Sequence, residues 1–166
     1  SMKTMEWTNV ERKEWPAGPW DGEPDKVQWQ DEPTGLPCIA VRNPRSGNWC
    51  GYVGVSEGHP AFGKGYSDED VSYEVHGGLT YANFCQPHDD EEGKGICHIA
   101  APGEPDRVWW LGFDCAHGGD YSPQDAIYAR DRPEWFWKLS GEDSYKPLQY
   151  VKNECAKLAE QLKAAA

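Results

Sequence analysis

The chain has 166 residues and a formal net charge of −12 at pH 7, from 28 acidic and 16 basic residues. This length favours one domain, and 38% hydrophobic residues with nine tryptophans suffice for a single modest core. The chain contains no run of Lys and Arg. We therefore expect no direct binding to a nucleic-acid backbone, which requires a basic stripe. No apolar run approaches the roughly 18 residues that span a bilayer, so no membrane association is expected.

The six cysteines bear on the cellular compartment. An even number invites a disulfide framework. However, no export signal is visible at the N-terminus, and a core of this size folds without covalent cross-links. We therefore expect reduced thiols and a location in the host-cell cytoplasm.

The first third of the chain contains an arm and a β-hairpin. Residues 2–24 are rich in Trp, Pro and Gly without a clean period, which predicts an irregular arm pinned to the body. Apolar and polar residues alternate around 27–29, as in a short strand. The segments 36–41 and 49–55 are apolar and flank a turn-rich stretch at 43–48, which predicts a hairpin.

The middle of the chain alternates short predicted strands with long loops. Val71, Tyr73 and Val75 predict a strand that ends at His76. Residues 77–95 form a long loop with an acidic tip, and 96–99 make a short strand candidate. The apolar run 108–113 predicts another strand. Long loops inside a compact domain are usually functional or mobile.

The C-terminal segment predicts an amphipathic helix. Apolar residues recur there at gaps of three and four, and Pro147 suits the first turn. Lys152 and Lys157 fall on the side of that helix that is expected to face solvent. The stripe consists of Leu148, Val151, Cys155, Leu158 and Leu162.

Together these segments predict an α+β fold. We expect a twisted, mainly antiparallel sheet with long loops, packed on one face by one C-terminal amphipathic helix. The whole chain from residue 2 to 166 forms a single domain in this prediction. Within it, residues 2–24 are the irregular arm and residues 145–166 the terminal helix.

The strongest candidate site lies where two predicted strands end in His-Gly-Gly. His76 ends the first, and His117 follows the second within the pattern Asp114-x-x-His117-x-x-Asp120. We expect both histidines at one edge of the sheet, where the glycines let the backbone approach a ligand closely. Trp110 provides an aromatic wall for stacking. The structural alternative is that these groups only cap turns and bond to neighbouring backbone.

The same set also fits a metal site. His76, Asp114 and His117 are ligand types that hydrolytic metal centres use, and such centres keep one position open for water. A divalent cation is therefore the cofactor that this pattern would accept, although the sequence identifies none.

Two weaker constellations involve cysteine. Cys85-x-x-His88 followed by Cys97-His98 offers zinc-type ligands, but neighbouring strand residues point to opposite faces. An ordinary loop is the alternative there. Cys115, with His76 earlier in the chain, loosely resembles circularly permuted papain-like hydrolases, which implies a thiol nucleophile. The long helix that such an enzyme needs after its cysteine is absent, and a buried structural thiol is the alternative.

Two motifs stand out in the chain: His-Gly-Gly-Leu-Thr-Tyr at 76–81 and Trp-Trp-Leu-Gly-Phe-Asp-Cys-Ala-His at 109–117. Through these motifs, most of the chain from about Leu36 onward resembles an uncharacterised family of small phage- and prophage-encoded proteins. The resemblance implies an intracellular protein of a phage or bacterium. It implies no activity and transfers no catalytic residue.

Three classes of function follow as hypotheses. The first is a small intracellular phage-type binding protein whose His/Asp/aromatic pocket takes a small polar ligand, such as a nucleotide or nucleotide signal that it sequesters. The second is a metal-dependent hydrolase that uses the same cluster. The third is an acidic protein without a pocket that blocks a host protein partner. Whether the chain is an enzyme stays open.

Overall fold

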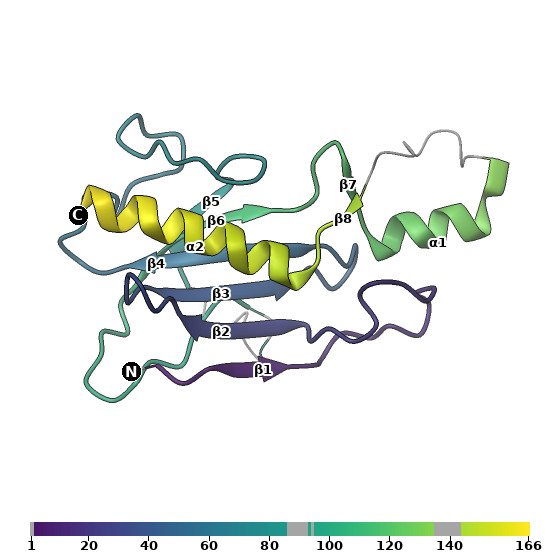
Figure 1. Ribbon diagram of the computed structural model, residues 1–166, viewed down its shortest axis with the longest axis horizontal. Coiled ribbons are helices and arrows are strands. Elements are labelled where there is room, and N and C mark those ends of the chain that lie inside the picture. The colour runs from purple at the N-terminus through teal and green to yellow at the C-terminus, as the bar shows by residue number, and fades with distance from the viewer. Residues whose placement is uncertain (1, 86–92, 94, 135–143) are drawn as a thin grey trace.

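The computed structural model describes residues 2–85, 93, 95–134 and 144–166. Its body is a six-stranded sheet in the order β1-β2-β3-β4-β6-β5, and every neighbouring pair is antiparallel. One long C-terminal helix crosses one face of this sheet (Figure 1). The predicted α+β fold is therefore confirmed. The strands are β1 (Met5–Trp7), β2 (Lys26–Gln30), β3 (Pro37–Arg42), β4 (Trp49–Val55), β5 (Tyr81–Phe84) and β6 (Trp109–Asp114).

The predicted hairpin forms the centre of the sheet. β3 and β4 pair with Arg42 opposite Trp49, and the Asn43 backbone N–H donates to the carbonyl of Asn48 across the loop. The Asn43 side chain accepts hydrogen bonds from the N–H groups of Arg45 and Ser46, which is the local bonding that favours Asn in turns. The hairpin turn is therefore encoded locally.

The helix α2 (Leu148–Ala165) covers the front face of the sheet, the face toward the viewer in Figure 1. Its stripe packs against alternate residues of β6, including Leu111 and Phe113. The predicted amphipathic pattern is confirmed, although Leu148 and Lys152 are half-buried. The fully buried positions are Val151, Cys155, Leu158, Ala159 and Leu162.

The back face of the sheet has its own apolar cluster, which contains Ile39, Val41, Val108 and Trp110. A disulfide between Cys85 and Cys97 lies on this side. The prediction that all six cysteines are reduced is therefore wrong for this pair. The prediction assumed that a core of this size makes disulfides unnecessary. The fold nevertheless brings Cys85 and Cys97, from two different loops, within bonding distance. The other four cysteines are free thiols.

Several segments differ from their predicted structure. Residues 71–75 and 96–99 are not strands. Conversely, β5 lies inside the segment predicted as a loop at 77–95, because β6 offers its edge there. The arm at 2–24 is not wholly irregular, since β1 pairs along β2.

The region between β6 and α2 contains elements that the sequence analysis did not predict. The short strands β7 (Asp120–Tyr121) and β8 (Ser144–Tyr145) form a parallel pair. Between them, α1 (Pro123–Asp131) extends beyond the end of the sheet (Figure 1). The helix expected at 145 begins at Leu148 because β8 and Pro147 precede it. The run Pro-Glu-Trp-Phe-Trp at 133–137 also suggests a short helix in the sequence, but it lies mostly outside the described residues.

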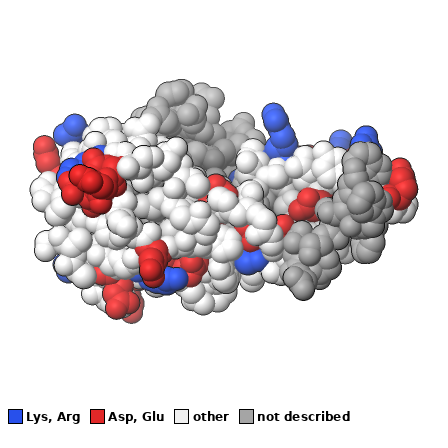
Figure 2. Space-filling model, turned by 90° about the horizontal axis from the view of Figure 1, so that it is seen from above, with Lys and Arg blue, Asp and Glu red and all other residues white. Residues whose placement is uncertain are grey.

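The acidic side chains on one face of the molecule lie in small separate groups (Figure 2). On the face shown in Figure 2, acidic side chains are interspersed with a few basic ones, and no basic stripe is visible. Among the described residues, no helix is both long and apolar enough to cross a membrane.

Candidate functional site

His76 is held at three points. Its backbone N–H donates to a carboxylate oxygen of Glu154 at 2.8 Å. Its ring Nδ1 lies 2.7 Å from the Tyr150 hydroxyl, and its Nε2 lies 2.8 Å from Asp120 Oδ2. Both ring nitrogens are therefore engaged within the protein. This arrangement fixes the ring, and it leaves no free nitrogen for a ligand or metal.

The helix α2 replaces a neighbouring strand for the segment that carries His76. Glu154 binds the His76 N–H, and two turns further on the Gln161 side chain bonds both the N–H and the carbonyl of Glu74. The backbone N–H and C=O groups of this segment are thus hydrogen-bonded to side chains of α2 rather than to the backbone of a neighbouring strand. This explains why an alternating apolar pattern produced no strand.

Asp120 joins the segment to the loop after β6. Besides His76, it accepts the backbone N–H of His117 at 3.0 Å, and the Lys146 ammonium lies 3.0 Å from its Oδ1. Its side chain is only 3% exposed. Burial raises the pKa of this carboxyl, but the hydrogen bonds from His76, the His117 N–H and Lys146 outweigh that effect. The pKa is lowered overall, so Asp120 is a carboxylate at neutral pH.

The structure confirms that His76 and His117 lie side by side, with ring centroids 6.2 Å apart. Gly77 makes this approach possible, because a Cβ at that position would lie 2.2 Å from the His117 ring. The first glycine of the motif therefore accommodates a neighbouring histidine rather than a ligand.

His117 and Asp114 form the outer part of this cluster. The Nε2 atom of His117 lies 3.2 Å from Asp114 Oδ1, but it forms no hydrogen bond with the described residues. Asp114 instead accepts the Ala116 N–H and the Thr80 hydroxyl. Asp114 thus behaves as a turn cap, as the structural alternative for that residue predicted.

A cleft of about 400 Å³ opens beside this cluster. Its walls come from the hairpin turn at Ser46 and Asn48, from the loop 115–118, and from the segment 120–125 that leads into α1. His117 and Asp120 line the cleft. His76 is not among the lining residues, but it bonds Asp120, which is.

The start of α1 forms one wall of the cleft. Ser122 and Asp125 make a capping box, in which each side chain accepts the backbone N–H of the other residue. The Gln124 N–H donates to the carbonyl of Ser46. Pro123 packs so closely on Gly47 that a Cβ there would lie 2.5 Å from its ring. The Ser-Pro-x-Asp sequence is a helix-start signal that could have revealed this wall.

Trp110 does not belong to this site. Its side chain is 1% exposed and packs in the back-face cluster, whereas the segment of His76 rests on α2 at the front. Successive residues of a strand point to opposite faces, so Trp109 faces the front core and Trp110 the back. The expected aromatic wall is therefore wrong for this residue.

The metal and thiol interpretations gain no support from the geometry. Among the described residues, no three His, Cys, Asp or Glu side chains form a group that could hold a metal ion. His76, Asp114 and His117 are adjacent, but the nitrogens of His76 are already bonded. Cys115 is 2% exposed, and burial raises its thiol pKa, which opposes formation of the nucleophilic thiolate.

The second cysteine constellation is likewise not a zinc site in this form. Cys85 and Cys97 are bonded to each other. His98 packs edge-on against Trp110, with ring centroids 5.1 Å apart. His88 lies outside the described residues.

No protein-family model, curated protein or solved structure matches this chain. The resemblance to phage proteins therefore stays a prediction. What the chain does must be inferred from the chemistry of its own site.

Proposed function

We propose that this protein binds a small polar molecule in the cleft between the hairpin turn, the loop after β6 and the start of α1. The cleft itself carries the proposal: its volume of about 400 Å³ falls in the range of small-molecule sites. Two of the residues expected at the site, His117 and Asp120, line it.

The chemistry of the cleft favours a ligand that donates hydrogen bonds. Asp120 and Asp125 are its carboxylates, and none of the described lining residues is Lys or Arg. Amide and hydroxyl groups complete the walls at Asn48, Ser122 and Gln124. The base and sugar of a nucleoside offer such donors, whereas a phosphate would meet like charge. A nucleotide would thus insert its nucleoside part and keep its phosphate outside.

In this proposal His76 is a positioning residue. It holds Asp120, which in turn holds the backbone of His117 at the cleft. Tyr150 and Glu154 fix His76 from α2. The network keeps the cleft wall rigid before the ligand arrives, which reduces the entropic cost of binding.

The other two hypotheses lack a specific observation in their favour. A hydrolase would need a set of free metal ligands, and the described residues provide none. An acidic protein that blocks a partner by mimicking nucleic acid would need a regular row of carboxylates, whereas the face in Figure 2 carries separate small groups. Binding without chemistry, and hence sequestration of the ligand, fits the site best.

Titration of ¹⁵N-labelled protein with nucleosides and their 5′-monophosphates tests this function. We expect a nucleoside to shift the amide resonances of Gly118, Tyr121 and Gln124 at the cleft. The matching monophosphate should bind no more tightly, because none of the described residues that line the cleft is Lys or Arg. Gln124→Ala should weaken binding, while the exposed control Gln149→Ala should not. Shifts that map elsewhere, or none at millimolar ligand, would refute nucleoside binding at this cleft.

A further inference from the structure

We propose that the Cys85–Cys97 disulfide is a redox-sensitive clasp. In the oxidised form it closes residues 95–99, which we call the strap, over the back face of the sheet. A dithiol reductant opens it and uncovers that face. This inference concerns the side of the sheet opposite α2 and does not depend on the proposed ligand site.

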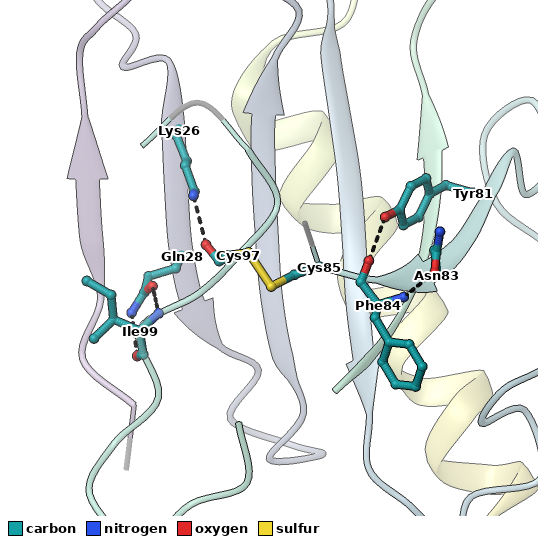
Figure 3. Close-up of a disulfide and its surroundings, with 8 residues drawn as sticks. All are labelled: Lys26, Gln28, Tyr81, Asn83, Phe84, Cys85, Cys97 and Ile99. Carbon is teal, nitrogen blue, oxygen red and sulfur yellow. Dashed lines mark hydrogen bonds between the residues drawn. A yellow bond between two sulfur atoms is a disulfide. The ribbon is translucent and has the colours of Figure 1, made fainter. Parts of the chain in front are cut away.

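The disulfide joins the end of the edge strand to the strap, across a Cα–Cα distance of 5.0 Å. Cys85 directly follows the edge strand β5, whereas the strap is anchored on β2, and β3, β4 and β6 lie between these two strands. Figure 3 shows the strap on the near side of the sheet, with α2 behind it. One covalent bond thus joins an edge strand to a segment that rests on a distant strand.

Side chains of β2 hold the strap. The Lys26 ammonium donates to the carbonyl of Cys97 at 2.8 Å (Figure 3). The Gln28 side chain accepts the Ile99 N–H at 2.8 Å and donates to the Ile99 carbonyl at 3.2 Å. Lys26 and Gln28 are both almost completely buried. Opening the strap would return an ammonium and an amide to water, which compensates for the hydrogen bonds that are lost.

The strap also covers apolar surface. Ile96 packs on the back-face cluster, and the His98 ring lies against Trp110. Ile39 and Trp110 are at most 1% exposed in the closed form. Release of the strap therefore exposes to solvent part of the back-face apolar cluster, which is buried when the clasp is closed.

Of the six cysteines, only Cys85 and Cys97 are joined by a disulfide, so a reductant acts on this pair. Cys85 and Cys97 are only half-buried, so a reductant can reach them. The free cysteines are Cys38, Cys50, Cys115 and Cys155, and burial raises the pKa of each thiol, so none supplies a competing thiolate at neutral pH. A thiolate of the dithiol attacks one sulfur and forms a mixed disulfide. Its second thiol then displaces the protein sulfur, which leaves a cyclic disulfide and two protonated cysteines.

The covalent link dominates the closed state. The two cysteines are 12 residues apart in the sequence, and closing a loop of that size favours the closed form by about a hundredfold. Without it, the hydrogen bonds to β2 and the contacts of Ile96 and His98 must hold the strap alone.

Thiol titration and hydrogen exchange test the clasp. Denatured protein prepared without reductant should show four thiols, and six after treatment with dithiothreitol. Reduction should speed exchange of the Ile99 amide at least about tenfold, because its Gln28 partner is lost on opening. The His76 amide, bound to Glu154 on the other face, should keep its rate and so report that the fold is intact.

A double variant separates reduction of the clasp from other effects of the reductant. Cys85→Ser/Cys97→Ser should exchange at Ile99 as fast as the reduced wild-type protein and should not respond to dithiothreitol. Cys50→Ser, which alters a free thiol, should keep the full response. Six thiols before reduction would overturn the proposal. So would an Ile99 rate that is unchanged by reduction, or one that rises only together with the His76 rate.

Discussion

At the scale of single residues, His76 illustrates how a candidate ligand can be a structural group. Each of its polar atoms in the site meets a partner: Glu154 and Tyr150 on α2, and Asp120 on β7. From the sequence, His76 and His117 are expected to act alike. The structure separates them, because only His117 lines the cleft.

His76→Ala should lower the free energy of unfolding by about 1–3 kcal/mol, because it leaves the buried Asp120 without one of its donors. His117→Ala should cost less, since no described residue bonds its Nε2. Urea denaturation of both variants measures the difference. Equal costs would contradict the distinct roles of the two histidines.

Asp120 should make stability depend on acid pH. Its pKa is lowered in the folded state, so its contribution is fully present above the unfolded value of about 3.9 and is lost as pH falls through the folded value. Asp120→Asn should therefore destabilise the protein at pH 7 and flatten the loss of stability below about pH 4. Denaturation midpoints of both proteins between pH 2 and 7 check this. An unchanged slope in the variant would show that other carboxylates determine the acid response.

At the scale of elements, α2 has two functions in the fold. Its apolar stripe covers the front core, and its polar side chains at Tyr150, Glu154 and Gln161 hold the segment of His76. The site therefore depends on the register of this helix against the sheet.

Leu158→Ala should lower the free energy of unfolding by about 2–5 kcal/mol, because Leu158 is fully buried between α2 and the sheet and its loss leaves a cavity. The exposed neighbour Glu160→Ala is the matched control and should change stability by less than about 0.5 kcal/mol. Thermal unfolding of both variants measures the contrast. A similar melting temperature for the two would refute the packing of α2 described here.

At the scale of the whole molecule, a buried guanidinium ties distant parts of the chain together. The Arg42 side chain is fully buried and donates to Asp25 at 3.0 Å, to the Gly47 carbonyl at 2.7 Å and to the Tyr145 hydroxyl at 2.8 Å. Its planar group also lies 4.4 Å from the centre of the Trp49 ring. The N-terminal part, the hairpin and the strand before α2 thus meet at one residue.

Arg42→Ala should cost about 3–5 kcal/mol, because it leaves the fully buried carboxylate of Asp25 with one partner fewer. Arg45→Ala, in the exposed turn of the same hairpin, should have little effect. Chemical denaturation compares the two. Limited proteolysis should also cut the arm at 2–24 faster in Arg42→Ala than in the control. An arm that is equally protected in both would contradict the joining role of Arg42.

The sequence by itself determined those elements whose pattern is local. The hairpin around 43–48 and the stripe on α2 follow from turn chemistry and from apolar spacing, which neighbouring residues alone express. The adjacency of His76 and His117 was also predictable, since each follows an apolar segment with the same His-Gly-Gly step. The Ser122–Asp125 capping box was readable as well, although it was missed.

Only the tertiary structure decided which partners these residues meet. The alternating segment 71–75 forms no strand, because side chains of α2 occupy its backbone groups. Trp110 does not belong to the site, because the alternation of side chains along β6 places it on the back face. Cys85 and Cys97 form a disulfide, because the fold brings two loops together. Each outcome depends on contacts between residues far apart in the chain, and a local pattern contains no information about such contacts.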